Sequence, residues 1–245
     1  MILAIDAGNT RIKWGLHDGR RWAALGSGAT TDAAAVLGEL PGRFTRPERV
    51  AICNVAGPET GTAAGRLADH WGAALIEILP RPFQCGVSNG YADPGQLGAD
   101  RWAAVIAAWR RRGRACLVVN AGTAMTVDML DDEGHFRGGM IVPGHALMRQ
   151  ALAERSAALD RGPGRFDWYP KNTANAVYSG ALVALVGAVE HVAARFEEDL
   201  GAPPSILLAG GDGELLRAHL RLPVEIVEHL VLEGVVCIAQ EEAGP

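Results

Sequence analysis

The stretch MILAIDAGNT, residues 1–10, decides the fold of this chain because its pattern returns in CLVVNAGTA, residues 116–124. In both copies an apolar run leads into a short turn that contains glycine and threonine. A second strand-like segment follows each turn, at residues 11–16 and 125–129. A buried strand that ends in such a turn can bind phosphate, since glycine lets backbone N–H groups approach an anion closely. Two such turns predict two related domains that hold a nucleotide triphosphate between them.

The other segments predict the same order of elements twice. The first half predicts strands at 2–6, 11–17, 21–27, 50–53 and 74–78, helices at 32–40, 58–71 and 98–112, and a loop at 80–97. The second half predicts strands at 115–120, 124–130, 135–142, 205–208 and 224–227, helices at 144–158 and 172–199, a loop at 160–170, and helices after the last two strands. Three hairpin strands followed by alternating helix and strand indicate a duplicated α/β protein, with domains at 1–113 and 114–245.

Charge and composition exclude several function classes. A net charge of −5 and a pI near 5.8 argue against nucleic-acid binding, which requires a basic face. The basic cluster at 110–114 ends an apolar helix, where cations are stabilising. The cysteines lack CxxC spacing and the histidines lack a zinc pattern, so we expect reduced cysteines, no zinc and a cytoplasmic location. The longest apolar helical stretch, 181–189, is too short to span a bilayer, and residue 1 leads directly into a strand, so we expect neither a membrane span nor a signal peptide.

The first turn carries the side chains that a phosphate and a metal ion require. Asp6 ends a predicted buried strand, where α/β sheets commonly bind ligands, and its carboxylate suits Mg²⁺ beside a phosphate. Gly8, Asn9 and Thr10 offer backbone and side-chain donors, and Lys13 adds a positive charge. The alternative is an ordinary hairpin turn, for which Gly-Asn is well suited. The second copy favours the functional interpretation.

A third glycine-rich turn, residues 209–213, follows the predicted strand at 205–208. Gly210 and Gly211 allow a flat base or ribose to lie against the backbone, with a helix N-terminus just beyond. A helix start that needs tight packing explains the same glycines. The motif is not GxGxxG, so a Rossmann dinucleotide site is a poor match.

Several motifs, in order along the whole chain, resemble those of type III pantothenate kinases. They are Asp6-x-Gly8-Asn9-Thr10-x-x-Lys13, Gly98-x-Asp100-Arg101, Gly122-Thr123-Ala124-x-Thr126-Val127-Asp128, Gly138-Gly139-x-Ile141-x-Pro143-Gly144, Asn172-Thr173-x-x-Ala176, Gly210-Gly211 and Leu230-Val231-Leu232-Glu233-Gly234. The resemblance implies the fold of the acetate and sugar kinase, Hsp70 and actin superfamily. That fold has two duplicated ribonuclease-H-like (actin-like ATPase) domains with an interdomain cleft.

The resemblance also implies an activity and roles for individual residues. The family phosphorylates the terminal hydroxyl of pantothenate with ATP and Mg²⁺, the first committed step towards coenzyme A. By this resemblance, the ATP-binding residues are Asp6, Gly8, Asn9, Thr10, Lys13, Thr123, Gly210 and Gly211. The pantothenate-binding residues are Tyr91, Gly98, Ala99, Asp100, Arg101 and Thr173. Asp100 falls on the catalytic base.

Asp100 and Arg101 fit that chemistry. Phosphoryl transfer needs positioning and charge neutralisation, with a carboxylate that accepts the hydroxyl proton. Asp100 opens a helix, where the macrodipole favours the ionised carboxylate. Arg101 can pair with the carboxylate of pantothenate through two donors. The alternative for Asp100 is an N-cap or first-turn acid with no catalytic role.

One residue departs from the family pattern. The second turn usually begins with an aspartate that helps to hold an activating K⁺ or ammonium ion, and here Asn120 stands there. An amide oxygen can still bind K⁺ but adds no negative charge, so we expect a weak or rearranged site for the monovalent cation.

Two alternatives to a pantothenate kinase stay open: a kinase for another small substrate, and a non-catalytic, nucleotide-binding regulatory protein that resembles accessory factors of this family. The motifs at 98–101 and 172–173 argue against the first. The intact Asp6, Lys13, Asp100 and Arg101 argue against the second. The resemblance also implies a homodimer. The apolar segments at 103–109 and from 172 on can supply its interface or be buried in the monomer.

Overall fold

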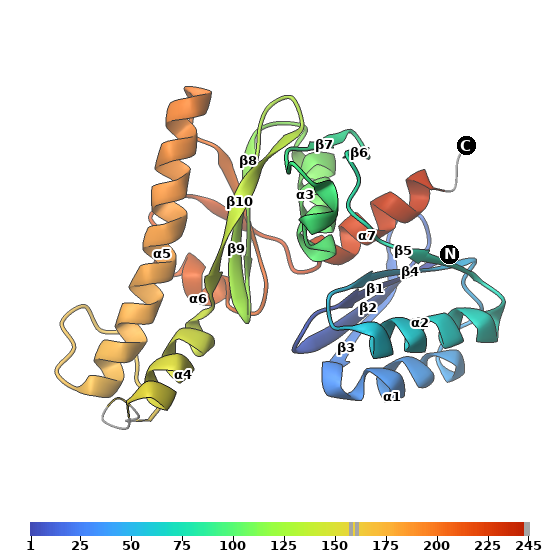
Figure 1. Ribbon diagram of the computed structural model, residues 1–245, viewed down its shortest axis with the longest axis horizontal. Coiled ribbons are helices and arrows are strands. Elements are labelled where there is room, and N and C mark those ends of the chain that lie inside the picture. Colours follow the sequence, from blue (N-terminus) through green and yellow to red (C-terminus); the bar gives the residue numbers. More distant parts are fainter. Residues whose placement is uncertain (157–158, 160–161, 243–245) are drawn as a thin grey trace. The chain divides into compact units, whose positions relative to one another are not determined.

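The structure is a computed structural model that describes residues 1–156, 159 and 162–242 (Figure 1). By its internal contacts the chain divides into two compact units. Unit 1 comprises residues 1–113, 134–136 and the C-terminal segment from His229, and unit 2 comprises residues 114–133 and 137–228. Each unit is built on its own sheet.

Unit 1 contains a five-stranded sheet in the order β3-β2-β1-β4-β5. Its strands are β1 (Ile2–Ala7), β2 (Arg11–His17), β3 (Trp22–Ala29), β4 (Arg49–Asn54) and β5 (Ala74–Glu77). The first three strands are antiparallel neighbours, whereas β1 pairs with β4 and β4 with β5 in parallel. The strand predictions for this half of the chain are therefore confirmed.

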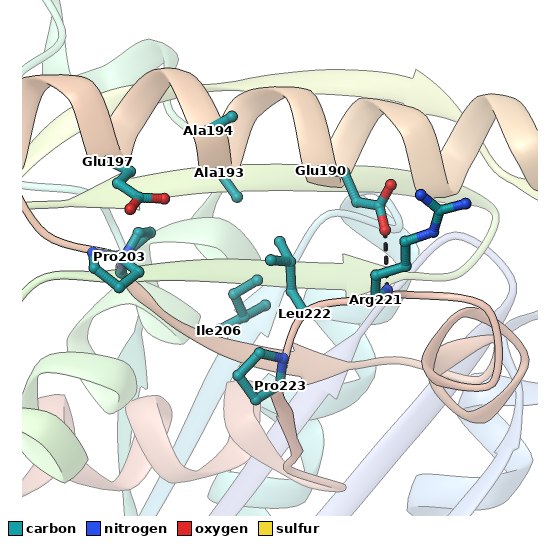
Figure 2. Close-up of a pocket in the computed structure, with 10 residues that line it drawn as sticks. Glu190, Ala193, Ala194, Glu197, Pro203, Ile206, Arg221, Leu222 and Pro223 are labelled. Atoms are coloured by element: carbon teal, nitrogen blue, oxygen red, sulfur yellow. Dashed lines mark hydrogen bonds between the residues drawn. The ribbon is translucent and has the colours of Figure 1, made fainter.

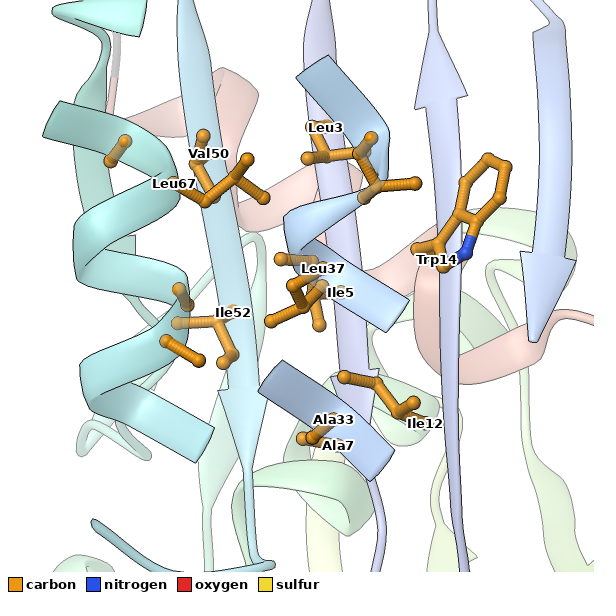
Figure 3. Close-up of a cluster of buried hydrophobic side chains, with 14 of the residues drawn as sticks. Leu3, Ile5, Ala7, Ile12, Trp14, Ala33, Leu37, Val50, Ile52 and Leu67 are labelled. Atoms are coloured by element: carbon orange, nitrogen blue, oxygen red, sulfur yellow. The ribbon is translucent and has the colours of Figure 1, made fainter. Parts of the chain in front are cut away.

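The core of unit 1 explains why β1 is apolar from Ile2 to Ile5. Helices α1 (Ala33–Gly38) and α2 (Pro58–Trp71) cover one face of the sheet, where Leu37 and Leu67 pack over Ile5 and Val50 (Figure 3). Helix α7 (Leu230–Glu241) packs against β1 and β4. A strand covered on both faces has no position for a solvated side chain, so its sequence does not alternate.

The segment 80–97, expected as a loop, contains regular structure. It forms a short hairpin of β6 (Phe83–Gln84) and β7 (Val87–Asn89), and then a 3₁₀ turn at Pro94–Gln96. The hairpin turn is Cys85-Gly86, with φ of 51° and 81°, which is the backbone of a type I′ turn. The Nε1–H of Trp102 donates to Oε1 of Gln84 over 2.8 Å and attaches the hairpin to helix α3 (Ala99–Arg112). The expectation of an irregular loop was therefore wrong here.

Helices α3 and α7 pack closely within unit 1. A Cβ on Gly234 would lie 1.9 Å from the carbonyl oxygen of Ala103, so only glycine permits this approach. Arg111 adds an ion pair with Glu233, with an N–O distance of 3.0 Å. The residues from Ala103 to Ala108 are buried as a result. The apolar stretch at 103–109 therefore belongs mostly to the core of the monomer.

Unit 2 repeats the topology of unit 1. Its strands are β8 (Cys116–Ala121), β9 (Ala124–Leu130), β10 (His135–Pro143, in unit 2 from Arg137), β11 (Ser205–Ala209) and β12 (Val224–Ile226). Their order β10-β9-β8-β11-β12 matches β3-β2-β1-β4-β5, with β8 antiparallel to β9 and parallel to β11. The helices are α4 (His145–Arg155), α5 (Thr173–Leu200) and α6 (Gly213–Arg217). The predicted duplication of a ribonuclease-H-like α/β domain is confirmed.

Helix α5 has the length that the sequence predicted, since 172–199 and Thr173–Leu200 both contain 28 residues. By length and composition alone this helix could cross a membrane, so the expectation that its apolar stretch is too short to do so was wrong. One side of the helix, including Leu182, Leu185 and Val189, is buried in the core of unit 2 over β8 and β9. A core helix passes the same test of length and composition.

The expected domain boundary and the contact-based units agree at Gly113 and differ at the C-terminus. The segment from His229 follows the second copy in sequence but packs into unit 1, since α7 lies against α3 and β1. In the duplicated pattern α3 and α7 are equivalent, because each follows the fifth strand of its copy. The division at 1–113 and 114–245 stays a prediction about the sequence repeat.

Candidate active site

The first turn lies at the carboxyl end of β1, between the strands that the apolar pattern predicted. The amide of Gly8 donates to the carbonyl of Arg11 over 3.1 Å and closes the turn. Asn9 and Thr10 are exposed at its tip. An exposed turn with donors at the end of a buried strand has the chemistry of an anion site.

Side chains alternate between the two faces of a strand, so Asp6 points away from the core that α1 and α2 cover. Leu3, Ile5 and Ala7 belong to that core, so Asp6 leaves the opposite face of the sheet. Lys13 on β2 and Cys53 on β4 are its register partners and share that face. The structure therefore brings Asp6 and Lys13 together, as the site prediction requires.

Burial dominates the electrostatics of Asp6, of which only 9% is exposed. Removal from water raises the pKa of this carboxyl to about 6, against the opposing effect of the Lys13 charge. The negative charge of Asp100 raises the pKa further, which links the start of α3 to the end of β1. The same two carboxylates and complete burial raise the pKa of the Cys53 thiol. A cation beside Asp6 would relieve the cost of its buried charge.

Asp100 occupies the first turn of α3, as predicted. Its Oδ1 accepts from the backbone N–H of Arg101 over 2.9 Å. A Cβ on Gly98 would lie 2.6 Å from this oxygen, so the glycine at the N-cap gives the carboxylate its room. Ala99 is buried beneath the same turn. The motif from Gly98 to Arg101 is thus a compact helix start that presents one partly exposed carboxylate.

Arg101 is 5% exposed and lies beside two aromatic rings that pack against each other. Its Nη1 donates to the hydroxyl of Tyr91 over 2.9 Å. Its guanidinium carbon lies 5.8 Å from the ring centre of Tyr91 and 5.9 Å from that of Phe136. Stacking and hydrogen bonding hold the guanidinium in one orientation, as recognition of a carboxylate through two donors requires.

In unit 2 the second turn is enclosed by two glycines from other segments. The amide of Gly144 donates to the carbonyl of Thr123 over 2.9 Å, and a Cβ on Gly144 would lie 1.9 Å from the oxygen of Gly122. Gly210 has φ of 96°, and a Cβ there would lie 2.1 Å from the oxygen of Ala121. The structure therefore brings the turn of Thr123 and the turn of Gly210-Gly211 together. Thr123 and Gly211 are exposed.

Asn120 ends β8 in the position that Asp6 has on β1. It is half-buried and lies directly opposite Thr126 on β9, so both side chains leave the same face of the sheet. The hydroxyl of Thr126 is buried and has no hydrogen-bond partner among the described residues. Buried hydroxyls are normally paired, so Thr126 keeps unused hydrogen-bonding capacity on the face that it shares with Asn120.

Thr173 begins α5 in unit 2, after the N-cap Asn172, whose side chain accepts from the amide of Asn175 over 2.9 Å. It lines an open apolar groove of about 1020 Å³ between α4 and α5. None of Thr123, Gly210 and Gly211 lines that groove. Thr173 therefore lines a groove that includes neither of the two glycine turns.

A smaller pocket of about 290 Å³ lies between the later part of α5 and the segments before β11 and β12 (Figure 2). Apolar side chains such as Ile206 and Leu222 line it, together with Glu190, which accepts from the backbone N–H of Arg221 over 2.9 Å. None of the predicted site residues lines it. It adds no reactive group to the site.

Sequence reasoning missed four residues that support the site: Thr30, Phe136, Gly144 as the closure of the second turn, and the unpartnered Thr126. Phe136 acts through packing, which leaves no signal in a single sequence, and the motif that contains Gly144 did not indicate its contact with the second turn. Thr126 lay inside a quoted motif, but its orientation towards Asn120 required the strand register.

The fold defines the class: the chain has two duplicated ribonuclease-H-like α/β domains, the fold of the actin-like ATPases. A solved structure from Campylobacter jejuni, described as a Baf family transcriptional activator, is similar with a TM-score of 0.62, 19% identity, and coverage of 99% of this chain and 100% of the other. An activator of 2-hydroxyisocaproyl-CoA dehydratase from Clostridium difficile, with bound ADPNP, is similar with a TM-score of 0.57, 11% identity, and coverage of 99% and 95%.

The sequence comparisons are more specific than the fold. The family model for type III pantothenate kinase matches residues 2–195. The type III pantothenate kinase of Nitrosospira multiformis is 45% identical, over 98% of this chain and 92% of the relative. That of Aromatoleum aromaticum is 44% identical over the full length of both. The chain belongs to the type III pantothenate kinase family.

Proposed function

We propose that this protein transfers the γ-phosphoryl group of ATP to the terminal hydroxyl of pantothenate and so forms 4′-phosphopantothenate for coenzyme A biosynthesis. The observation that carries the proposal is the start of α3, where the Asp100 carboxylate lies next to an arginine oriented by Tyr91 and Phe136. A proton acceptor and a carboxylate-binding group on adjacent residues match a substrate with a hydroxyl at one end and a carboxylate at the other.

Each unit contains a turn suited to the phosphates of a nucleotide. In unit 1 the exposed tip of Asn9 and Thr10, with Gly8 and Lys13, offers donors and a positive charge to the phosphates. In unit 2 Thr123 is the corresponding donor, and the Gly210-Gly211 turn beside it offers open backbone to the nucleoside.

The residues around Asp6 fit a magnesium ion. Asp6 is a buried carboxylate whose charge is costly without a cation, and among the described residues no group of three or more acidic, cysteine or histidine side chains could hold a metal alone. Mg²⁺ commonly binds through one or two carboxylates, with substrate phosphates and water as its other ligands. When bound, the ion neutralises charge on the phosphates.

Asp100 accepts the proton in the proposed reaction. The substrate oxygen bonds to the γ-phosphorus while the bond to the leaving ADP oxygen breaks, and the hydroxyl proton passes to the carboxylate. The backbone N–H of Arg101 holds one oxygen of Asp100, which fixes the direction of the other. Arg101 and the hydroxyl of Tyr91 bind the carboxylate end of pantothenate, and the family resemblance makes Thr173 a further candidate for substrate binding.

Asn120 and Thr126 support a site for a monovalent cation. Their side chains share one face of the sheet, and the buried Thr126 hydroxyl has no partner among the residues that the structure describes. An amide oxygen and a hydroxyl are acceptable ligands for K⁺ or ammonium. Neither carries a charge, so the proposed ion is weakly bound.

The groove between α4 and α5 supports a homodimer. Leu147 and Leu152 are 40% and 42% exposed in it, and an exposed apolar groove of this kind is typical of an interface. Light scattering after size exclusion tests this: Leu147→Asp should give monomers, whereas Leu79→Asp, at an exposed leucine of unit 1, should leave dimers. We place the enzyme in the cytoplasm, where its proposed substrates are metabolised.

An ADP-release assay tests the proposed function. The protein is given ATP, Mg²⁺ and pantothenate, with and without K⁺ or ammonium, and the product is identified by mass spectrometry. Pantothenate-dependent ADP release with formation of phosphopantothenate is the expected result. Folded protein that binds ATP but yields no product in any ion would contradict the proposal.

A further inference from the structure

Thr30 makes two hydrogen bonds to the first phosphate turn. It begins the 3₁₀ turn Thr30–Asp32 that follows β3. Its Oγ1 donates to the carbonyl of Gly8 over 2.6 Å, and its backbone N–H donates to the carbonyl of Thr10 over 3.1 Å. Both partners belong to the turn between β1 and β2, and the side chain is half-buried there.

Unit 2 contains an equivalent closure at Gly144. Gly144 follows the third strand of its copy, as Thr30 does, and donates its amide to Thr123, which directly precedes the second strand, as Thr10 does. The duplicated fold thus holds each turn from the residue after the third strand. In unit 2 the backbones are in direct contact, since a Cβ on Gly144 would lie 1.9 Å from the Gly122 oxygen. In unit 1 the Thr30 hydroxyl takes the place of that contact.

The hydroxyl bond determines where the turn directs its donors. A peptide unit is planar, and in its trans form the C=O and the following N–H point in opposite directions. When Thr30 holds the Gly8 carbonyl towards itself, the amide of Asn9 must point away from Thr30. A fixed donor costs less entropy when it binds an anion than a donor on a freely rotating turn.

We propose that Thr30 is a positioning residue for nucleotide binding: it fixes the Gly8–Asn9 peptide so that the Asn9 amide is directed at a phosphate group of ATP. The inference rests on the proposed function, because it takes the first turn as the ATP site. It adds a residue outside the family motifs, whose role is to orient the turn and not to touch the substrate.

The test compares three variants by calorimetric titration with a non-hydrolysable ATP analogue and Mg²⁺, and by steady-state kinetics. Thr30→Val keeps the shape and removes the donor, so the Kd of the analogue and the KM for ATP should rise roughly tenfold, the effect of one lost hydrogen bond. The KM for pantothenate should not change. Thr30→Ser keeps the hydroxyl and should bind as the wild type does. Thr31→Val, at the exposed neighbour in the same 3₁₀ turn, is the matched control and should also be unchanged.

Three results would overturn the inference: wild-type affinity in Thr30→Val, equal weakening in Thr30→Ser, or equal weakening in Thr31→Val. Thermal unfolding of each variant separates a loss of affinity from a loss of folded protein. The binding arm needs no pantothenate turnover. A failure of the proposed substrate therefore appears as wild-type protein that binds the analogue without forming product, whereas a failure of the inference appears in the comparison of the Thr30 and Thr31 variants.

Discussion

Lys13 lies directly opposite Asp6 in the antiparallel pairing of β1 with β2, and its ammonium group does not compensate for the burial of the carboxylate. An opposite charge beside an acid normally lowers its pKa. Here desolvation has the larger effect, and the pKa of Asp6 is raised to about 6. The first turn thus holds a carboxylate that is costly to ionise without a bound cation, which is an expected property of a site built for Mg²⁺ and phosphate.

We predict that Asp6→Asn changes the pH dependence of stability in the nucleotide-free and metal-free protein. The folded-state pKa is about 6 and the ordinary value 3.8, so folded wild type holds the proton more strongly and loses stability as the pH rises from about 4 to 6. The loss is about 3 kcal/mol. The variant lacks this titration. Urea unfolding at pH 4 and pH 7.5 measures the free energy of unfolding of the variant and of wild type. The stability of the variant relative to wild type should increase from pH 4 to pH 7.5. An equal difference at the two pH values would contradict the raised pKa of Asp6.

We predict that Asp100→Asn lowers kcat by about 10²–10⁴-fold, the usual contribution of a general base. The amide preserves the shape and can still accept from the Arg101 N–H, so the fold and substrate binding should persist. The ADP-release assay measures the loss, and circular dichroism checks the fold. Asp69→Asn, at an exposed acid near the end of α2, is the control and should keep full activity. Near-normal turnover in Asp100→Asn would remove this carboxylate as the base.

We predict that Arg101→Lys and Tyr91→Phe weaken pantothenate binding to different extents. Lysine keeps the charge but loses the planar fork and its contacts with the rings of Tyr91 and Phe136, so the KM for pantothenate should rise roughly a hundredfold. Phenylalanine keeps the stacking and loses one hydrogen bond, so the rise should be roughly tenfold or less. The KM for ATP should stay constant in both variants. Equal effects on the two KM values would indicate a structural role for the pair.

The sequence was sufficient to predict most of the architecture because its strands are apolar runs with clear turn signals. The sequence placed the motif from Gly98 to Arg101 correctly at a helix start, because a glycine at the N-cap and an acid in the first turn are typical of a helix N-terminus. The hairpin at 83–89 was not predictable. Its strands are two and three residues long, which is too short to show an alternation of apolar and polar residues. Its turn also places Cys85, which is not a glycine, at positive φ.

Long-range backbone contacts explain the other features that the sequence did not indicate. The C-terminal helix packs into unit 1 because Gly234 meets the backbone of Ala103, and no local pattern contains that contact. The role of Thr30 depends on the pairing of β2 with β3, which brings a residue 22 positions away to the carbonyl of Gly8. Single-sequence periodicity describes local structure, whereas the supports of this site are formed by contacts between distant segments.

We predict that Gly210→Ala destabilises the protein strongly and Gly211→Ala does not. At Gly210 a Cβ would lie 2.1 Å from the backbone of Ala121, and φ of 96° is unfavourable for any side chain. The loss should be about 3 kcal/mol or more. At Gly211 no atom lies within 4 Å of the added Cβ, so stability should change by about 0.5 kcal/mol or less. Denaturant unfolding of the two variants is the measurement, and equal stabilities would contradict the described turn.

We predict that Asn120→Asp strengthens binding of the monovalent cation. The substitution adds a negative charge opposite the buried Thr126 hydroxyl, on the face where both side chains project. A charged ligand attracts K⁺ more strongly than an amide, so the half-saturating K⁺ concentration should fall roughly tenfold or more, corresponding to at least about 1.4 kcal/mol. Titration of thermal stability with KCl, at ionic strength held constant with tetramethylammonium chloride, reports binding independently of turnover. Asn120→Ala should show no K⁺ effect, and a K⁺ response unchanged in both variants would place the cation elsewhere.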